Sequence, residues 1–148
     1  MKLINTSTFE IELSDEQRKQ LSSKEKIEVA LKDKNIFSFN IYEQDNLIGF
    51  AMLRKYSDIG YFLWNYAIDI KYQNKGYGTK ALLFLIDYFE TKYNALELTT
   101  TYTFGNEIAK HVYEKIGFIE TDIVDEDGIH EVNMIYRRGF NNDNKWNI

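Results

Sequence analysis

Apolar and polar positions form a succession of short segments along the chain, each with its own period. A two-residue alternation, or a short apolar run between turn residues, predicts a strand, whereas apolar positions three and four residues apart predict an amphipathic helix. We therefore expect strands at 9–13, 37–42, 47–53, 61–70, 96–103, 118–123 and 130–136. We expect helices at 15–21, 22–31, 78–93 and 106–116.

Polar residues at the ends of these helices have the chemistry of caps. Asp15 is the expected cap of the first helix, and Ser22 and Glu25 have the spacing of a capping box for the second. Asn106 is expected to cap the last helix and Gly117 to end it. These residues fix the predicted helix ends more closely than the apolar pattern does.

The order of the elements predicts a mixed sheet. The segments 37–53 and 118–136 each read as two strands joined by a polar turn, which indicates antiparallel hairpins. The strand at 61–70, the helix at 78–93 and the strand at 96–103 form a crossover unit, which places two parallel strands side by side. We expect an α+β fold with a mostly antiparallel sheet of six to seven strands and about four helices.

Length and composition indicate one domain. The chain has 148 residues, no proline and no repeat or linker that would divide it, so we expect one domain at 1–140 and a flexible, Asn-rich tail at 141–148. No apolar run reaches the roughly 20 residues that cross a bilayer, and the first residues have no apolar signal region. We therefore expect a cytoplasmic protein that does not bind membranes.

Charge and cysteine content narrow the chemistry. The formal net charge of −5 argues against a nucleic-acid partner and suits a cationic small molecule. Without cysteine there is no thiol nucleophile and no cysteine zinc site. The two histidines, His111 and His130, have no third ligand at a recognisable spacing, so we expect no metal.

The segment from Gln73 to Thr79 carries the strongest signal for a binding site. It lies between a predicted strand and a predicted helix and contains two glycines, which let the backbone approach a ligand. The first N–H groups of a helix and its positive dipole end attract an anion. Lys75 and Lys80 would add positive charge, and Thr79 would add a hydroxyl donor, so the segment predicts a phosphate site.

Other classes of nucleotide-binding loop fit this segment less well. A Walker A loop needs a Gly-Lys pair, and the chain contains none. Gly76, Gly78 and Ala81 match the dinucleotide pattern, but five residues separate Ile70 from Gly76, and too little chain remains for a second nucleotide-binding half. The glycines could also serve only to shape a sharp turn.

Two motifs together resemble the GCN5-related N-acetyltransferases, or GNAT family. Gln73-x-x-Gly76-x-Gly78 is similar to the family's [QR]-x-x-G-x-[GA] loop. The segment from Asn106 through Ala109 and Tyr113 to Gly117-Phe118 is similar to the family's N-x-x-A-x-x-x-Y-x-x-x-G-F element. The resemblance covers roughly 47–136. It implies a GNAT fold in which the fourth and fifth strands are parallel and splay apart.

The resemblance also implies roles for individual residues, with acetyl-coenzyme A (acetyl-CoA) as co-substrate. The backbone of the bulged fourth strand would bind the acetyl carbonyl and pantetheine amides, the glycine loop would bind the diphosphate, and Asn106 would contact the coenzyme across the gap. Lys110, one helical turn beyond Asn106, could reach a coenzyme phosphate on spacing alone. The expected coenzyme-binding residues are Tyr66, Ala67, Ile68, Gln73, Asn74, Lys75, Gly76, Tyr77, Gly78, Thr79, Asn106 and Lys110.

Tyr113 is the expected catalytic residue, because the resemblance places it beside the sulfur as the acid that protonates the leaving thiolate. By pattern alone a tyrosine on an apolar helix stripe is more often core, and Asn106 is a good cap without any ligand. The base that deprotonates the amine has no sequence candidate, because Trp64 and Asn65 stand where related polyamine acetyltransferases often have an acidic residue.

The expected acceptor is a small primary amine. The acidic chain, and the similarity of 49–52 and the glycine loop to bacterial spermidine acetyltransferases, favour a polyamine. An acetyltransferase for protein N-termini or lysines, and a non-catalytic acetyl-CoA-binding module, are the alternatives. The expected assembly is a homodimer.

Overall fold

The computed structural model describes residues 1–139, so the expected tail at 141–148 and the last residue of the expected domain lie outside the described part. Its strands are β1 (Lys2–Asn5), β2 (Ile36–Glu43), β3 (Asn46–Lys55), β4 (Gly60–Ile68), β5 (Glu97–Thr103), β6 (Ile119–Glu126) and β7 (Ile129–Arg137). Its helices are α1 (Asp15–Gln20), α2 (Lys24–Ala30), α3 (Tyr77–Tyr93), α4 (Glu107–Ile116) and the short 3-10 helix η1 (Ile70–Tyr72).

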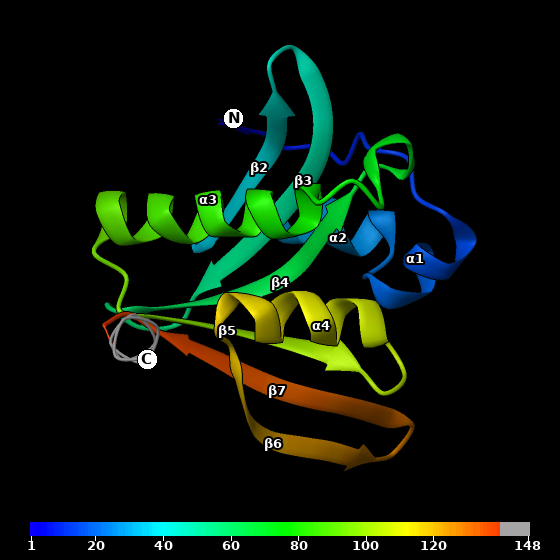
Figure 1. Cartoon of the computed structure of the whole chain (residues 1–148), viewed down its shortest axis with the longest axis vertical. Coiled ribbons are helices and arrows are strands. Elements are labelled where there is room, and N and C mark those ends of the chain that lie inside the picture. Colours follow the sequence, from blue (N-terminus) through cyan, green and yellow to red (C-terminus); the bar gives the residue numbers. More distant parts are fainter. Residues whose placement is uncertain (140–148) are drawn as a thin grey trace.

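The strands form one sheet in the order β1-β2-β3-β4-β5-β7-β6, and only the β4–β5 pair is parallel. Helix α3 connects these two strands, as the crossover pattern predicts. In Figure 1, α3 and α4 lie in front of the sheet, and α1 and α2 lie behind it at the right of the view, next to β4. We call these sides the front and rear faces. The α+β prediction with a mixed, mostly antiparallel sheet is confirmed.

Each face of the sheet has its own core. On the front face, the stripe predicted for α3 is buried to within 3% exposure, from Ala81 to Phe89. On the rear face, a smaller cluster joins Ile27 of α2 to Phe50, Met52 and Ala67 of the central strands. Successive residues of a strand point to opposite faces. Each side chain on β4 is therefore assigned to the front or the rear of the sheet.

The strand predicted at 9–13 is wrong, although its alternating pattern has a structural meaning. Phe9, Ile11 and Leu13 are buried in the rear cluster, so the segment is one-sided, but it has no partner strand in the sheet. Its backbone bonds to the chain after β4 instead: the Glu12 N–H donates to the Asp69 carboxylate at 3.0 Å, and the Glu12 carbonyl accepts from the Ile70 N–H at 2.8 Å. The first strand of the sheet is β1, which the pattern did not predict.

The caps of the first two helices also differ from prediction. Ser14, not Asp15, caps α1, and it forms a capping box with Gln17. Ser23, not Ser22, caps α2 and accepts from the Lys26 N–H. Each observed cap therefore lies one residue away from the predicted one. By contrast, Asn106 caps α4 as predicted, with its side chain accepting from the Ala109 N–H at 3.2 Å.

In the described residues, no helix is long and apolar enough to cross a membrane. The same part of the chain contains no group of three or more His, Asp or Glu side chains placed to hold a metal. His130 lies next to the acidic turn between β6 and β7, where its Nδ1 is 2.5 Å from the Asp125 carboxylate.

Candidate active site

The two parallel strands separate part-way along their length. β4 and β5 pair only from Gly60 opposite Glu97 to Leu63 opposite Thr100, after which both strands continue without pairing to each other. The Thr100 hydroxyl donates to the Leu63 carbonyl at 3.1 Å, at the last rung before they part. Beyond this rung the facing edges of the two strands do not pair with each other, so backbone groups there can bind a ligand, although the Ile68 carbonyl at the end of β4 accepts from the Gln73 and Gln17 side chains. We call the gap between these edges the fork.

A bulge in β4 accompanies the fork. Met52 of β3 is opposite Asn65, and the next residue, Leu53, is opposite Leu63, so Trp64 has no partner on β3. An extra residue in one strand bends it and increases its twist. The bulge therefore lies at Trp64, two residues before the position expected around Tyr66, Ala67 and Ile68.

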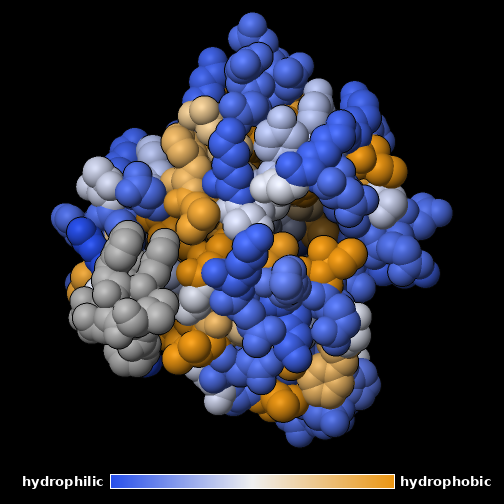
Figure 2. Space-filling view, in the orientation of Figure 1, coloured by the Kyte–Doolittle hydropathy of each residue, from blue (hydrophilic) through white to orange (hydrophobic). Residues whose placement is uncertain are grey.

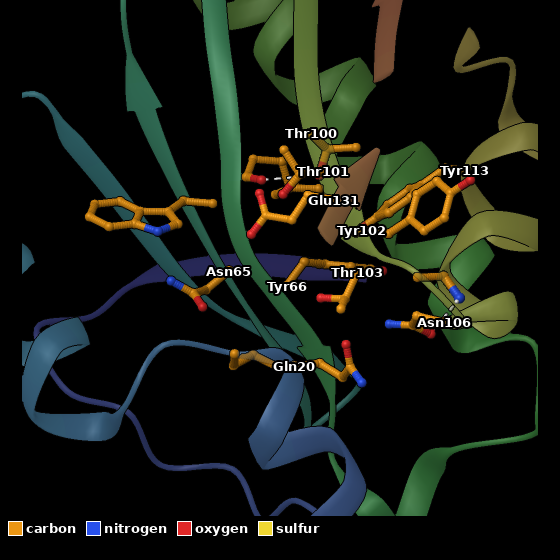
Figure 3. Close-up of a pocket in the computed structure, with 14 residues that line it drawn as sticks. Gln20, Asn65, Tyr66, Thr100, Thr101, Tyr102, Thr103, Asn106, Tyr113 and Glu131 are labelled. Carbon is orange, nitrogen blue, oxygen red and sulfur yellow. Dashed lines mark hydrogen bonds between the residues drawn. The ribbon is translucent and has the colours of Figure 1, made fainter. Parts of the chain in front are cut away.

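A cavity of about 110 Å³ occupies the fork. Figure 3 shows that its labelled side chains come from β4, β5, α4, β7 and the end of α1. Figure 2 shows a hollow between α3 and α4 on the front face. The residues that line the cavity are Gln20, Leu21, Leu63, Trp64, Asn65, Tyr66, Thr100, Thr101, Tyr102, Thr103, Asn106, Ala109, Tyr113 and Glu131.

The N-terminus of α3 begins in the loop predicted to bind phosphate. Gly76 is the N-cap residue with φ +84, a left-handed conformation that favours glycine, and it has no side chain to accept from the first N–H groups of the helix. Asn74 is also left-handed, at φ 61. A helix start without a side-chain cap has donors available for an anion.

Gly78 differs from Gly76 because the fold does not require a glycine there. A Cβ at Gly78 would have only the Ile68 side chain near it, at 3.9 Å, and the residue has ordinary helical geometry. Glycine inside a helix costs roughly 0.5–1 kcal/mol relative to alanine. The turn interpretation therefore explains Gly76 and leaves Gly78 unexplained, whereas close approach of a ligand explains both.

The side chains of this loop have different partners. The Gln73 amide nitrogen donates to the Ile68 carbonyl at 2.9 Å and to the Gln17 side chain, so Gln73 holds the loop against β4 and α1. Lys75 is exposed, and its Nζ lies 5.9 Å from the centre of the Tyr72 ring. Lys80, expected to add charge to the phosphate site, instead pairs with the Glu43 carboxylate at 3.0 Å.

Two tyrosines, Tyr66 and Tyr113, lie on the front side of the fork. The Tyr66 hydroxyl donates to the Gly78 carbonyl at 2.5 Å and so ties β4 to the start of α3. Tyr113 of α4 is buried, as both the core and the catalytic interpretations require. Burial raises the pKa of the Tyr113 phenol above its ordinary value of 10.0, and the Thr100 hydroxyl opposes part of the rise. Tyr113 is therefore protonated at neutral pH.

Tyr77 and Thr79 lie half-buried in the first turn of α3, and four further predicted residues divide into two groups. Asn106 lines the cavity while it caps α4, so the cap role and a ligand role are compatible. Ala67 and Ile68 do not line the cavity, and they are buried in the rear and front cores respectively. Lys110 is half-exposed on α4 and does not line it either.

The structure also brings residues to the cavity that sequence reasoning missed. Glu131 of β7 and Gln20 at the end of α1 line it, although both are far from the two motifs in sequence. The register that places Glu131 opposite Thr103 of β5 could not be derived from the local pattern. Asn65 is buried, and its side chain accepts from the Ser22 N–H at 3.0 Å, so it positions the α1–α2 turn.

A forked parallel pair, a cavity in the fork and a glycine-capped helix start together define an acyltransferase that uses a coenzyme A thioester. Residues 2–118 match the model of the acetyltransferase (GNAT) family. The chain therefore belongs to the GNAT family of acetyltransferases, whose members use acetyl-CoA. A comparison with curated protein sequences finds no match.

Solved structures share the fold at low sequence identity. A GNAT family acetyltransferase from Elizabethkingia anophelis with acetyl-CoA bound is 19% identical with a TM-score of 0.71, covering 92% of this chain and 97% of that one. A point mutant of spermidine N-acetyltransferase from Vibrio cholerae is 23% identical with a TM-score of 0.70, covering 84% and 80%. The same enzyme in complex with CoA and spermine is 24% identical with a TM-score of 0.67, covering 79% and 74%.

Proposed function

We propose that the protein transfers the acetyl group of acetyl-CoA to a small primary amine by direct attack of the amine on the thioester. The observation that carries this proposal is the cavity in the fork, which is lined on its front side by Tyr113 and on its rear side by residues of α1 and β7. Donor and acceptor can therefore reach one point from opposite faces of the sheet.

The donor is proposed to bind from the front face. Its diphosphate lies against the first N–H groups of α3, where Gly76 and Gly78 leave room for it. Its pantetheine arm enters the fork, where the unpaired edge of β4 supplies donors and acceptors for the arm's amides. Two lysines could reach phosphate oxygens: Lys75, which is exposed just before α3, and Lys110, which is half-exposed in the first turn of α4.

The transfer step requires one acid. The neutral amine forms the new C–N bond, the carbonyl oxygen carries the developing negative charge, and the C–S bond then breaks. Tyr113 gives its proton to the leaving thiolate, the nitrogen of the new amide loses a proton to water, and water returns a proton to the Tyr113 phenolate. The raised pKa of Tyr113 keeps it protonated before transfer, which suits an acid.

A polyamine is the acceptor to test first. The net charge of −5 attracts a cation, and two of the structures that share the fold are described as spermidine N-acetyltransferase, one of them with spermine. A homodimer, testable by light scattering, and a cytoplasmic location remain expectations.

Thiol release during incubation with acetyl-CoA and a panel of amines tests the proposal. We expect release with small amines, and Tyr113→Phe should lower kcat by about 10²- to 10⁴-fold while acetyl-CoA affinity stays unchanged. An unchanged kcat would remove the proposed acid. Acetyl-CoA binding without release for any amine would favour a non-catalytic module, and release with peptides alone would favour a protein acetyltransferase.

A further inference from the structure

Glu131 lies on the rear side of the fork. It is opposite Thr103 in the β5–β7 register, and its neighbours Val132 and Met134 belong to the pattern that packs into the front core. By the alternation of side chains along β7, Glu131 points to the rear. Figure 3 shows its carboxylate projecting from β7 into the cavity toward β4. A carboxylate therefore reaches the space from which the acceptor must approach.

Glu131 is the charged residue of this cavity. Among the described residues that line it, all others have neutral side chains at pH 7. Glu131 is half-buried as a residue, and no hydrogen bond or ion pair joins its carboxylate to another described residue. A partly desolvated and unpaired charge is unfavourable unless a ligand supplies the opposite charge.

Three other carboxylates of the same hairpin have partners within the protein, whereas Glu126 and Asp127 are exposed to solvent outside the cavity. Asp125 is paired with His130, Glu120 accepts from the Tyr102 hydroxyl at 2.9 Å, and Asp122 accepts from the Asn133 amide at 3.2 Å. These groups are engaged within the protein and lie outside the cavity. Glu131 combines an orientation into the cavity with the lack of a protein partner.

The aromatic alternative for cation binding is weaker. Trp64 lines the same cavity, but the Arg54 guanidinium already lies 5.3 Å from the centre of its ring. A ring with a cation on one face can offer only its other face to an ammonium group. Binding of a cationic acceptor at the rear of the fork therefore depends on Glu131.

We propose that Glu131 binds a second, non-reacting ammonium group of the acceptor, so that the enzyme selects diamines and polyamines over monoamines. This inference rests on the proposed function. An ion pair with the reacting nitrogen would keep that nitrogen protonated and unable to attack, because an opposite charge favours the charged form. A second ammonium carries no such penalty and can remain paired throughout the transfer.

The test compares a diamine with a monoamine of matched chain length in wild type and in Glu131→Gln, which keeps shape and removes charge. A charge-assisted hydrogen bond predicts a KM for the diamine about 10- to 100-fold higher in the variant, with kcat changed less. The monoamine KM should change by about 2-fold or less, and acetyl-CoA affinity should stay unchanged, which confirms folding. Glu126→Gln is the matched control, because it removes one exposed charge from the same hairpin outside the cavity.

The outcomes separate the two proposals. Equal loss in Glu131→Gln and Glu126→Gln would mean general attraction by the acidic hairpin and would overturn the role of Glu131. An active wild type whose preference for the diamine survives in Glu131→Gln would overturn it as well, while leaving the proposed function intact. If the wild type releases no thiol, calorimetric titration of the CoA-saturated protein with the diamine tests the inference. The inference is overturned if the wild type does not bind the diamine, or if Glu131→Gln binds it as tightly as the wild type does.

Discussion

Replacing Gly78 by alanine should raise the stability of the fold and weaken binding of acetyl-CoA. The added Cβ has only the Ile68 side chain near it, at 3.9 Å, so no strain opposes it. Alanine at a position that accepts it stabilises a protein by about 0.4–1 kcal/mol, chiefly through the unfolded state. For a chain of this size, such a gain corresponds to a rise in Tm of about 1–4 °C.

In the binding mode that we propose, the same Cβ would take the space of a phosphate oxygen at the start of α3. Loss of one charge-assisted hydrogen bond, worth about 1.5–3 kcal/mol, raises the Kd about 10- to 100-fold. Calorimetric titration with acetyl-CoA measures this change, and thermal unfolding without ligand measures the stability. The two quantities should move in opposite directions, which a mutation that merely disturbs the loop cannot produce.

Gly76→Ala is the matched comparison. Its φ of +84 is costly for alanine, roughly 1–2 kcal/mol, so both stability and affinity should fall together. A Gly78→Ala protein that binds acetyl-CoA as tightly as wild type would refute the assignment of this helix start to the diphosphate. A Gly78→Ala protein of lower stability would refute the geometric reasoning itself.

Two further predictions concern the strand β5. Thr100→Val should lower the free energy of unfolding, measured in urea, by about 1–3 kcal/mol, because the buried Leu63 carbonyl loses its donor. Thr100→Ser keeps the hydroxyl and should lower it much less. Equal losses in the two variants would contradict the hydrogen bond. Burial and the Glu120 carboxylate raise the pKa of Tyr102 to about 12, against 10.0 for an ordinary phenol. The phenol of the unfolded chain loses its proton at a lower pH than the phenol of the folded protein. The free energy of unfolding should therefore decrease as the pH rises from about 10 to about 12, and Tyr102→Phe should make this decrease smaller.

The elements that sequence predicted well are those with a strong local signal. The stripe of α3 and the cap Asn106 are determined by residues within one or two turns of each other, and the structure places them as expected. The glycine loop was recognisable for the same reason, since its backbone conformation depends on its own residues. The crossover from β4 to β5 followed from element order alone.

The misplaced features depend on partners distant in sequence. The segment containing Ile11 has the alternation of a strand, but Asp69, more than fifty residues away, takes its backbone N–H. The bulge at Trp64 depends on how β3 and β4 align, and the pairing of Lys80 with Glu43 depends on the β2–β3 hairpin. The local pattern of apolar residues indicates which side chains are buried, but it does not indicate which element they pack against.

The fork is the step that joins the fold to the chemistry. In a fully paired sheet, the backbone edge of β4 would be used by β5, and the two faces would be separated by an unbroken layer. Because pairing stops at Leu63 and Thr100, one opening is lined by strand edges that do not pair with each other, by the Tyr113 side chain of α4 and by the Glu131 carboxylate of β7. The chain has no cysteine that could carry the acyl group as a thioester, and the opening lets donor and acceptor meet directly. Direct transfer within a ternary complex is the mechanism that we propose for this opening.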